Sequence, residues 1–213
     1  MTAKDTLKSI QHAINEFLGP KTLAEDGIFG PKSRAALEKV VQMAEKPETV
    51  LGSGEIRAEF DARTEKNLAT LDPAAQVIFR PFIQAAKEAA GKLGFEYTAI
   101  GGTRSWAEQD KLYAQGRTAP GKIVTQARAG GSWHNFGIAL DFGVFRDGEY
   151  LDDSEPKTAS RVHNAIGKLA ENFGIYWGGS WDGFPDEPHF QVAVPYTLAE
   201  AAAKFKEKGT VLA

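Results

Sequence analysis

Two stretches with strand-like alternation, Ile138–Val144 and His189–Val194, constrain the fold of this chain more than any other feature of its sequence. In each stretch most alternate residues are bulky and apolar, as expected for a strand that turns one face toward a core. The opposite face carries small or polar residues, which include Asp141 in the first stretch and His189 in the second. A carboxylate in so apolar a strand is costly to bury without a partner. We therefore expect the two strands to present these polar groups to a shared site.

His134 adds a third polar group, because it precedes Asp141 within the same segment. Two imidazoles and one carboxylate suit zinc, which in catalytic sites typically takes three protein ligands and leaves one position for water. The chain has four histidines, and two of them belong to this set. A further carboxylate, Asp186, shortly precedes His189 and could act on that water. The alternative is a group of ordinary loop and strand residues, but their joint occurrence favours a metal-dependent hydrolase.

The residues around this set match the motifs of a known family, in the family's order. The motifs are Gly101–Ser105, Gln109, Leu112, Tyr113 and Gly116-Arg117 upstream, and Ser132-x-His134, Asp141, Trp177–Trp181 and Asp186-x-Pro188-His189 downstream. Over roughly residues 75 to 196, the chain resembles the zinc peptidases of the D-alanyl-D-alanine carboxypeptidase and L-alanyl-D-glutamate endopeptidase group. Phage endolysins that cleave peptidoglycan are well represented in that group. One departure is Ser180, where the family pattern has an acidic residue, and it concerns a loop and not the ligand set.

The resemblance implies a mechanism built on one zinc ion per chain. The implied ligands are His134, Asp141 and His189, and the implied general base is Asp186. A carboxylate in that role takes a proton from the attacking water and returns it to the leaving amine. Glu187 is the rival for the role. Because Pro188 keeps the residue before it extended, the two neighbouring carboxylates should face different ways, so that only one reaches the water.

Four further residues are candidates for contact with the substrate. The resemblance implies that Arg104 stabilises the oxyanion or a substrate carboxylate, for which a guanidinium fork is suited. The alternative for Arg104 is a surface arginine at the end of a strand. Gln109, Ser132 and Trp181 are weaker candidates for substrate binding. For the first two of these, the alternative is a role on a helix surface or in a turn.

The N-terminal segment shows a separate, helical pattern. Apolar residues recur at helical spacing from Leu7 to Leu18, Gly19-Pro20 interrupts them, and a second stripe runs from Ala36 to Ala44. Between the stripes, Asp26–Pro31 ends in a proline suited to the first turn of a helix. Over roughly residues 5 to 46, the segment resembles the small three-helix peptidoglycan-binding domain. Peptidoglycan is therefore the expected partner, and the alternative is a helical hairpin that packs on the catalytic domain.

The chain is expected to form two units. A peptidoglycan-binding-like helical domain over residues 1–50 precedes a linker or helical connector over 51–72 and a zinc peptidase domain over 73–213. Pro47–Gly54, which spans the boundary between the first two parts, is the best linker candidate. The catalytic domain is predicted to be α+β, with a small antiparallel sheet flanked by helices, because strands and helices do not alternate regularly. The family resemblance adds an expected likeness to the Hedgehog and DD-peptidase folds.

Capping residues predict where the helices of the catalytic domain begin. Asp72-Pro73 predicts an N-cap and a first-turn proline, with Pro81 as a kink further on. Ser105–Glu108 has the form of a capping box, which would place Gln109 on a short helix. Other expected elements are a strand over residues 95–100 and helices over 158–173 and 197–208. His163 belongs to no motif, so we expect it to be a surface or packing residue.

Composition excludes several classes of function. A net charge of -3 gives no reason to expect nucleic acid or an anionic membrane as a partner. The chain has no cysteine, which excludes disulfides and thiolate metal sites. No apolar run is long enough to span a bilayer, and the first residues lack the apolar stretch of a secretory signal. We expect a monomer that is made in the cytoplasm. As a phage or prophage enzyme, it would be released to the cell wall through a holin-type route.

The expected activity is hydrolysis of the peptidoglycan stem peptide between L-Ala and D-Glu. A wall-binding domain on an enzyme released from inside the cell suits an enzyme that breaks the peptidoglycan mesh. Removal of a terminal D-Ala would not break the mesh. The alternative within the family is a D-Ala-D-Ala carboxypeptidase. Two alternatives lie outside it: a catalytically inactive wall-binding protein, and a metal hydrolase of an unrelated peptide or amide.

Overall fold

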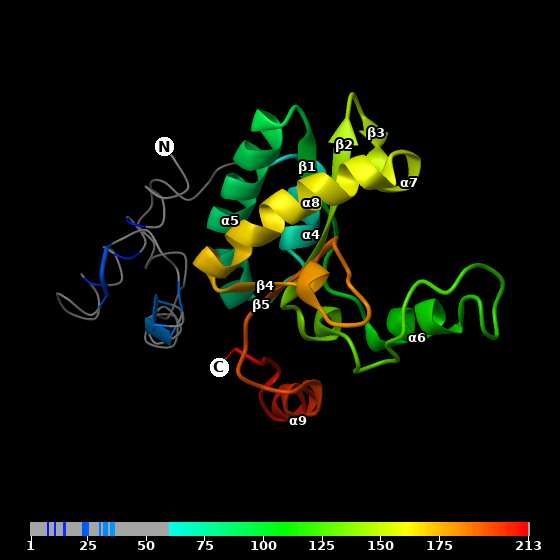
Figure 1. Cartoon of the computed structure of the whole chain (residues 1–213). Coiled ribbons are helices and arrows are strands. Elements are labelled where there is room, and N and C mark those ends of the chain that lie inside the picture. Colours follow the sequence, from blue (N-terminus) through cyan, green and yellow to red (C-terminus); the bar gives the residue numbers. More distant parts are fainter. Residues whose placement is uncertain are drawn as a thin grey trace.

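The computed structural model describes residues 60–212, together with scattered positions between Lys8 and Ala36 (Figure 1). The linker candidate Pro47–Gly54 and most residues of the proposed peptidoglycan-binding domain lie outside these residues. The predictions made for that segment therefore stay predictions, and the fold below is that of residues 60–212.

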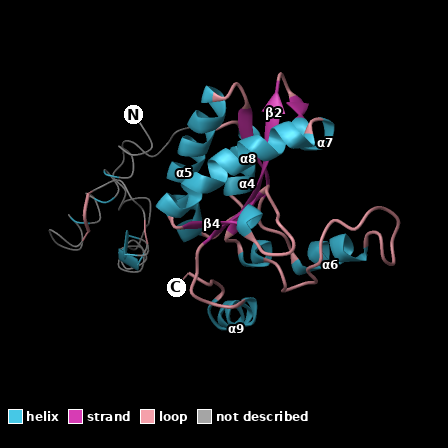
Figure 2. Cartoon of the chain, in the orientation of Figure 1, coloured by secondary structure: helices cyan, strands magenta, loops and turns pink. Residues whose placement is uncertain are grey.

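The domain has two long helices, and the first of them begins where its capping residues predict. Helix α5 (Pro73–Lys92) starts after Asp72, whose side chain accepts a hydrogen bond from the backbone N–H of Ala74, and it runs through Pro81. It follows the short helix α4 (Ala62–Leu68). Helix α8 (Pro156–Ala170) continues into the 3-10 turn η2 (Glu171–Phe173). α5 and α8 pack against each other, and Figure 2 shows α8 crossing in front of β2.

The strands form one antiparallel sheet. Its members are β1 (Glu96–Gly101), β2 (Ala139–Arg146), β3 (Glu149–Tyr150), β4 (Ile175–Trp177) and β5 (His189–Val192). The order is β1-β2-β5-β4, with β3 paired to β2, and every pair is antiparallel. The predicted α+β class, with a small antiparallel sheet flanked by helices, is confirmed. Among the described residues, no helix is both long and apolar enough to cross a membrane.

The apolar face of the sheet packs on α5, as the strand alternation predicts. Leu140, Phe142 and Val144 are all fully buried. The ring of Phe82 on α5 lies 5.9 Å from that of Phe142 and 5.0 Å from that of Phe190, measured between ring centroids. These aromatic contacts add to the free energy gained by burial. The core therefore holds β2 and β5 rigidly from one side and leaves their other face for a site.

His163 is a packing residue and lies outside the site. It is buried in α8, where its ring nitrogens lie 2.8 Å from the hydroxyl of Tyr97 and 2.7 Å from a carboxylate oxygen of Asp152. Asp152 belongs to the short helix α7 (Leu151–Ser154) and also accepts a hydrogen bond from the backbone N–H of Val144. Burial holds the pKa of Tyr97 well above its usual value, so its hydroxyl stays protonated as part of this network.

The remaining elements surround the polar face of the sheet. They are α6 (Trp106–Ala114), the 3-10 turns η1 (Trp133–Phe136) and η3 (Gly178–Ser180), and α9 (Leu198–Lys208). The predicted capping box is present at the start of α6, where Ser105 and Glu108 bond reciprocally. In Figure 1, α6 and the loop that follows it project from the body of the domain.

Candidate metal centre

Strand register brings the predicted ligands together. β2 and β5 pair with Asp141 directly opposite His189, and η1 delivers His134 just before β2 begins. On the other side of β2, Asp141 pairs with Gly101. A Cβ atom at that glycine would lie 3.1 Å from Asp141 Oδ2, so a glycine there leaves room for the carboxylate. The local sequence thus places all three groups at the face of the sheet that points away from the hydrophobic core.

The three candidate ligand atoms have the spacing of a metal site. His134 Nε2 lies 3.0 Å from Asp141 Oδ1 and 3.1 Å from His189 Nδ1. The remaining pair, His189 Nδ1 and Asp141 Oδ1, is 3.4 Å apart. Zinc ligands in tetrahedral geometry, at their usual bond lengths, are separated by about 3.3 Å. Both imidazoles are buried, and the three atoms form a compact group that could hold one metal ion.

Each imidazole also makes a hydrogen bond through the ring nitrogen that points away from the cluster, and this bond orients the ring for metal binding. His134 Nδ1 lies 2.8 Å from the carbonyl oxygen of Gly102, and His189 Nε2 lies 2.9 Å from Oε1 of Gln191. Both oxygens can only accept, so these ring nitrogens carry the protons, and in neutral rings the inward nitrogens are free to bind a metal. Two inward lone pairs and a carboxylate oxygen then converge with no hydrogen between them. Such a donor set suits a metal cation.

The charges of the cluster support the same conclusion. Burial opposes ionisation of Asp141, but the charges and hydrogen bonds of His134 and His189 outweigh it and hold the pKa of Asp141 well below its usual value. Burial likewise lowers the pKa of His189, but its hydrogen bond to Asp141 and the charge of Asp141 raise it above the ordinary value. Asp141 is thus an anion that attracts positive charge, either a proton on His189 or a metal ion.

A cavity of about 620 Å³ opens onto the cluster, within the usual range for ligand sites. Its lining includes the three candidate ligands and four other predicted site residues. These four are Arg104, Ser132, Trp181 and Asp186. The ring of Trp181 lies 4.9 Å from that of His189, between centroids. The structure therefore brings together every predicted site residue except Gln109.

Asp186, and not Glu187, faces the cavity. The side chain of Glu187 is turned to α8, where Oε1 accepts hydrogen bonds from Ser160 Oγ at 2.7 Å and Asn164 Nδ2 at 3.0 Å. Burial and the neighbouring charge of Asp141 raise the pKa of Asp186 above its usual value, against the opposing effect of nearby cationic groups. A carboxylate with a raised pKa is a better proton acceptor, which suits a general base.

The loop before Asp186 is set by close backbone contacts. The backbone N–H of Asp186 donates to the carbonyl oxygen of Gly178 at 3.0 Å. A Cβ atom at Gly178 would lie 2.6 Å from the carbonyl oxygen of Asp186 and 3.0 Å from His189 Cβ, so the contact needs a glycine. Ser180, the departure from the family pattern, is exposed, and its hydroxyl donates to the carbonyl oxygen of Trp177 at 2.7 Å. It does not line the cavity.

Gln109 does not have the position of a substrate contact. Its side chain is fully buried, and it lies outside the cavity lining. Its amide oxygen accepts a hydrogen bond from Arg104 Nη1 at 2.8 Å, and its amide nitrogen donates to the carbonyl oxygen of Ala127 at 2.8 Å. The structure thus gives Gln109 bonds to its neighbours and no place on the cavity wall.

Several residues that line the cavity were missed at the level of sequence. They are Val124, Thr125, Gln126, Ala127 and Phe184. They come from two loops without hydrophobic periodicity, so no local pattern marks them. Exposed apolar side chains are the available signal, since Val124 is 54% exposed and Phe184 is 57% exposed.

Comparisons with known proteins agree with this site. Residues 125–192, which include all three candidate ligands, match the family model described as D-alanyl-D-alanine carboxypeptidase. A curated relative is the peptidoglycan L-alanyl-D-glutamate endopeptidase CwlK of Bacillus subtilis (strain 168). It is 40% identical over 112 residues, which cover 51% of this chain and 67% of the relative.

Two solved structures show limited similarity to this chain. The L-Ala D-Glu endopeptidase ChiX of Serratia marcescens has a TM-score of 0.43 and 26% identity, with 62% of this chain and 88% of that chain covered. The vancomycin resistance D,D-pentapeptidase VanY, solved with Zn(II), has a TM-score of 0.41 and 17% identity, with coverage of 67% and 81%.

An antiparallel sheet that presents a His–Asp–His cluster to a cleft defines this chain as a metal-dependent peptidase. It belongs to the peptidase family whose members include D-alanyl-D-alanine carboxypeptidases and CwlK. The family resemblance seen in the sequence is thereby confirmed.

Proposed function

We propose that the protein is a zinc endopeptidase of the peptidoglycan stem that cleaves the bond between L-Ala and D-Glu. The main support for a zinc site is that His134 Nε2, His189 Nδ1 and Asp141 Oδ1 lie within 3.0 to 3.4 Å of one another. The choice of bond is supported by the 40% identity to CwlK, which is named for that activity.

Zinc held by these three residues would supply a Lewis acid that activates water and polarises the scissile carbonyl. Asp186 then accepts a proton from the attacking water and later gives it to the nitrogen of the leaving amine, so that the carboxylate is restored. Arg104, whose guanidinium lies beside Asp141 and lines the cavity, stabilises the negative charge that develops on the carbonyl oxygen. Ser132 and Trp181 line the same cavity and are proposed to contact the peptide.

Digestion of a defined muramyl pentapeptide tests this choice of bond. We expect muramyl-L-Ala and a tetrapeptide that begins with D-Glu, identified by mass spectrometry, with chelator-treated protein as the blank. Release of free D-Ala from a stem whose L-Ala–D-Glu bond stays intact would instead identify a D-Ala-D-Ala carboxypeptidase. Zinc-loaded protein that cleaves neither bond would support the inactive wall-binding alternative.

The proposed N-terminal module leads to a separate prediction. Two binding units on one chain gain affinity for a polymer through effective concentration. A form that lacks residues 1–50 should therefore cleave small soluble muropeptides at close to the full-length rate but sediment poorly with insoluble cell walls. Equal sedimentation of the two forms would argue against a binding role. The expected monomeric state and the holin-type delivery route also stay predictions.

A further inference from the structure

Gln109 connects Thr125 and Ala127, which form the rim of the cavity, to Arg104 in the cavity lining. Its buried amide spans two hydrogen bonds of 2.8 Å, one from Arg104 Nη1 to Oε1 and the other from Nε2 to the carbonyl oxygen of Ala127. A weaker contact of 3.3 Å joins Nε2 to Thr125 Oγ1. Ala127 and Thr125 line the cavity, whereas Gln109 does not. A single side chain thus lies behind two parts of the cavity wall.

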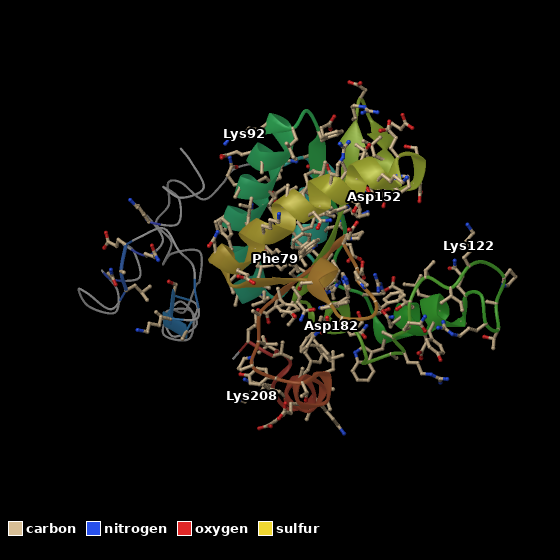
Figure 3. All side chains as sticks on the ribbon, in the orientation of Figure 1. Phe79, Lys92, Lys122, Asp152, Asp182 and Lys208 are labelled. Carbon is tan, nitrogen blue, oxygen red and sulfur yellow. The ribbon has the colours of Figure 1, made fainter. Side chains whose placement is uncertain are left out.

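The loop that carries Thr125 and Ala127 is held in a defined position. It follows α6, and Figure 3 shows Lys122 on its projecting part, away from the body of the domain. Arg117 bonds to the carbonyl oxygens of Tyr113 at 2.7 Å and Thr125 at 3.0 Å. The guanidinium groups of Arg117 and Arg128 lie 4.1 and 4.5 Å from the centre of the Tyr113 ring. These contacts tie the loop that carries Thr125 and Ala127 to α6.

Arg104 depends on Gln109 for its orientation. One guanidinium nitrogen is bonded to Gln109, and the other, Nη2, lies 3.5 Å from Asp141 Oδ2. Because a guanidinium is planar and rigid, a hydrogen bond to one of its nitrogens fixes the direction of the others. The contact to Asp141 is too long to fix the group by itself. Gln109 is therefore the tighter of the two side-chain constraints.

We propose that Gln109 is a positioning residue that couples the rim at Thr125 and Ala127 to Arg104. A peptide seated against the rim then keeps Gln109 in place, and Gln109 keeps the guanidinium where the oxyanion forms. This inference rests on the role of Arg104 in the proposed function. It assigns to Gln109 no contact with the substrate.

A double-mutant cycle tests the coupling. In the zinc-loaded enzyme, Gln109→Met should lower kcat by about 10- to 100-fold, because a misplacement of about 1 Å at a catalytic group has effects of that size. In an Arg104→Ala background the same change should lower kcat by less than about 3-fold, because two residues that act as a unit are not additive. Equal losses in both backgrounds would overturn the proposal.

The matched control is Gln76→Met in α5. Gln76 also donates a side-chain hydrogen bond to a backbone carbonyl, that of Leu71 at 3.0 Å, but it lies outside the cavity lining. Its replacement should leave kcat and KM within about 2-fold of the wild type, as is usual for a change away from the site. A loss of kcat as large as that of Gln109→Met would show a general effect of glutamine replacement and would contradict a specific role.

The two ends of the amide can be separated by Gln109→Glu. This change keeps an acceptor for Arg104 Nη1 but loses the donor to Ala127, so it should raise KM more than it lowers kcat. NMR of the guanidinium N–H groups gives a readout that needs no turnover. The Arg104 signals should be sharp in the wild type and in Gln109→Glu, and broadened by exchange in Gln109→Met. Sharp Arg104 signals in Gln109→Met would overturn the proposal, whether or not the enzyme is active. Failure of the wild type to cleave a stem peptide would refute only the proposed function.

Discussion

His134→Ala is expected to lose most of its zinc and to lower kcat/KM by about 10³-fold or more. The change removes one of three ligands, and the metal contributes several kcal/mol of stabilisation to the transition state. Metal analysis of the purified protein and initial rates on a muropeptide check this result. Because a ligand that binds only the folded state stabilises it, zinc should also raise the Tm of the wild type but not that of the variant.

The histidine at position 163 provides the matched control. It is buried like His134, but it bonds to Tyr97 and Asp152 in the core and does not line the cavity. His163→Gln should therefore lower Tm through the lost hydrogen bonds while it keeps a full equivalent of zinc. If His134→Ala keeps full zinc and full activity, the proposed ligand set is wrong.

Asp186→Asn should keep its zinc but lower kcat by about 10²- to 10⁴-fold, the usual range for loss of a general acid–base group. The amide has nearly the shape of the carboxylate but cannot take up the proton of the attacking water. Binding of zinc should change little, because Asp186 is not one of the three converging ligands. Steady-state rates, together with the zinc content of the same preparation, measure both effects.

The neighbouring carboxylate serves as the control for this variant. Glu187→Gln keeps a side chain that can still bond to Ser160 and Asn164, so its kcat should fall by no more than a few-fold. The reverse ranking of the two variants would assign the base to Glu187.

The side-chain pattern of the strands predicted most of the candidate metal site. Alternation alone predicts that Leu140, Phe142 and Val144 enter a core and that Asp141 does not, because successive side chains of a strand point to opposite faces. The helix starts at Asp72 and Ser105 were equally predictable, because caps are formed by residues close in sequence. The family motif adds the choice of ligands, since it matches position by position.

Which groups of similar chemistry reach the cavity depends on tertiary packing. Asp186 and Glu187 are neighbours with the same functional group, and they are distinguished because α8 supplies donors to Glu187 alone. Gln109 on a short helix has the pattern of a surface residue, but the loop after α6 folds over it and buries it against Arg104. Burial and hydrogen-bond partners depend on segments far away in the chain, whereas periodicity and caps depend on neighbours. Local sequence patterns therefore predicted the candidate ligands and the strands that carry them, whereas tertiary packing decides which carboxylate faces the cavity, what Arg104 contacts and which residues form the cavity walls.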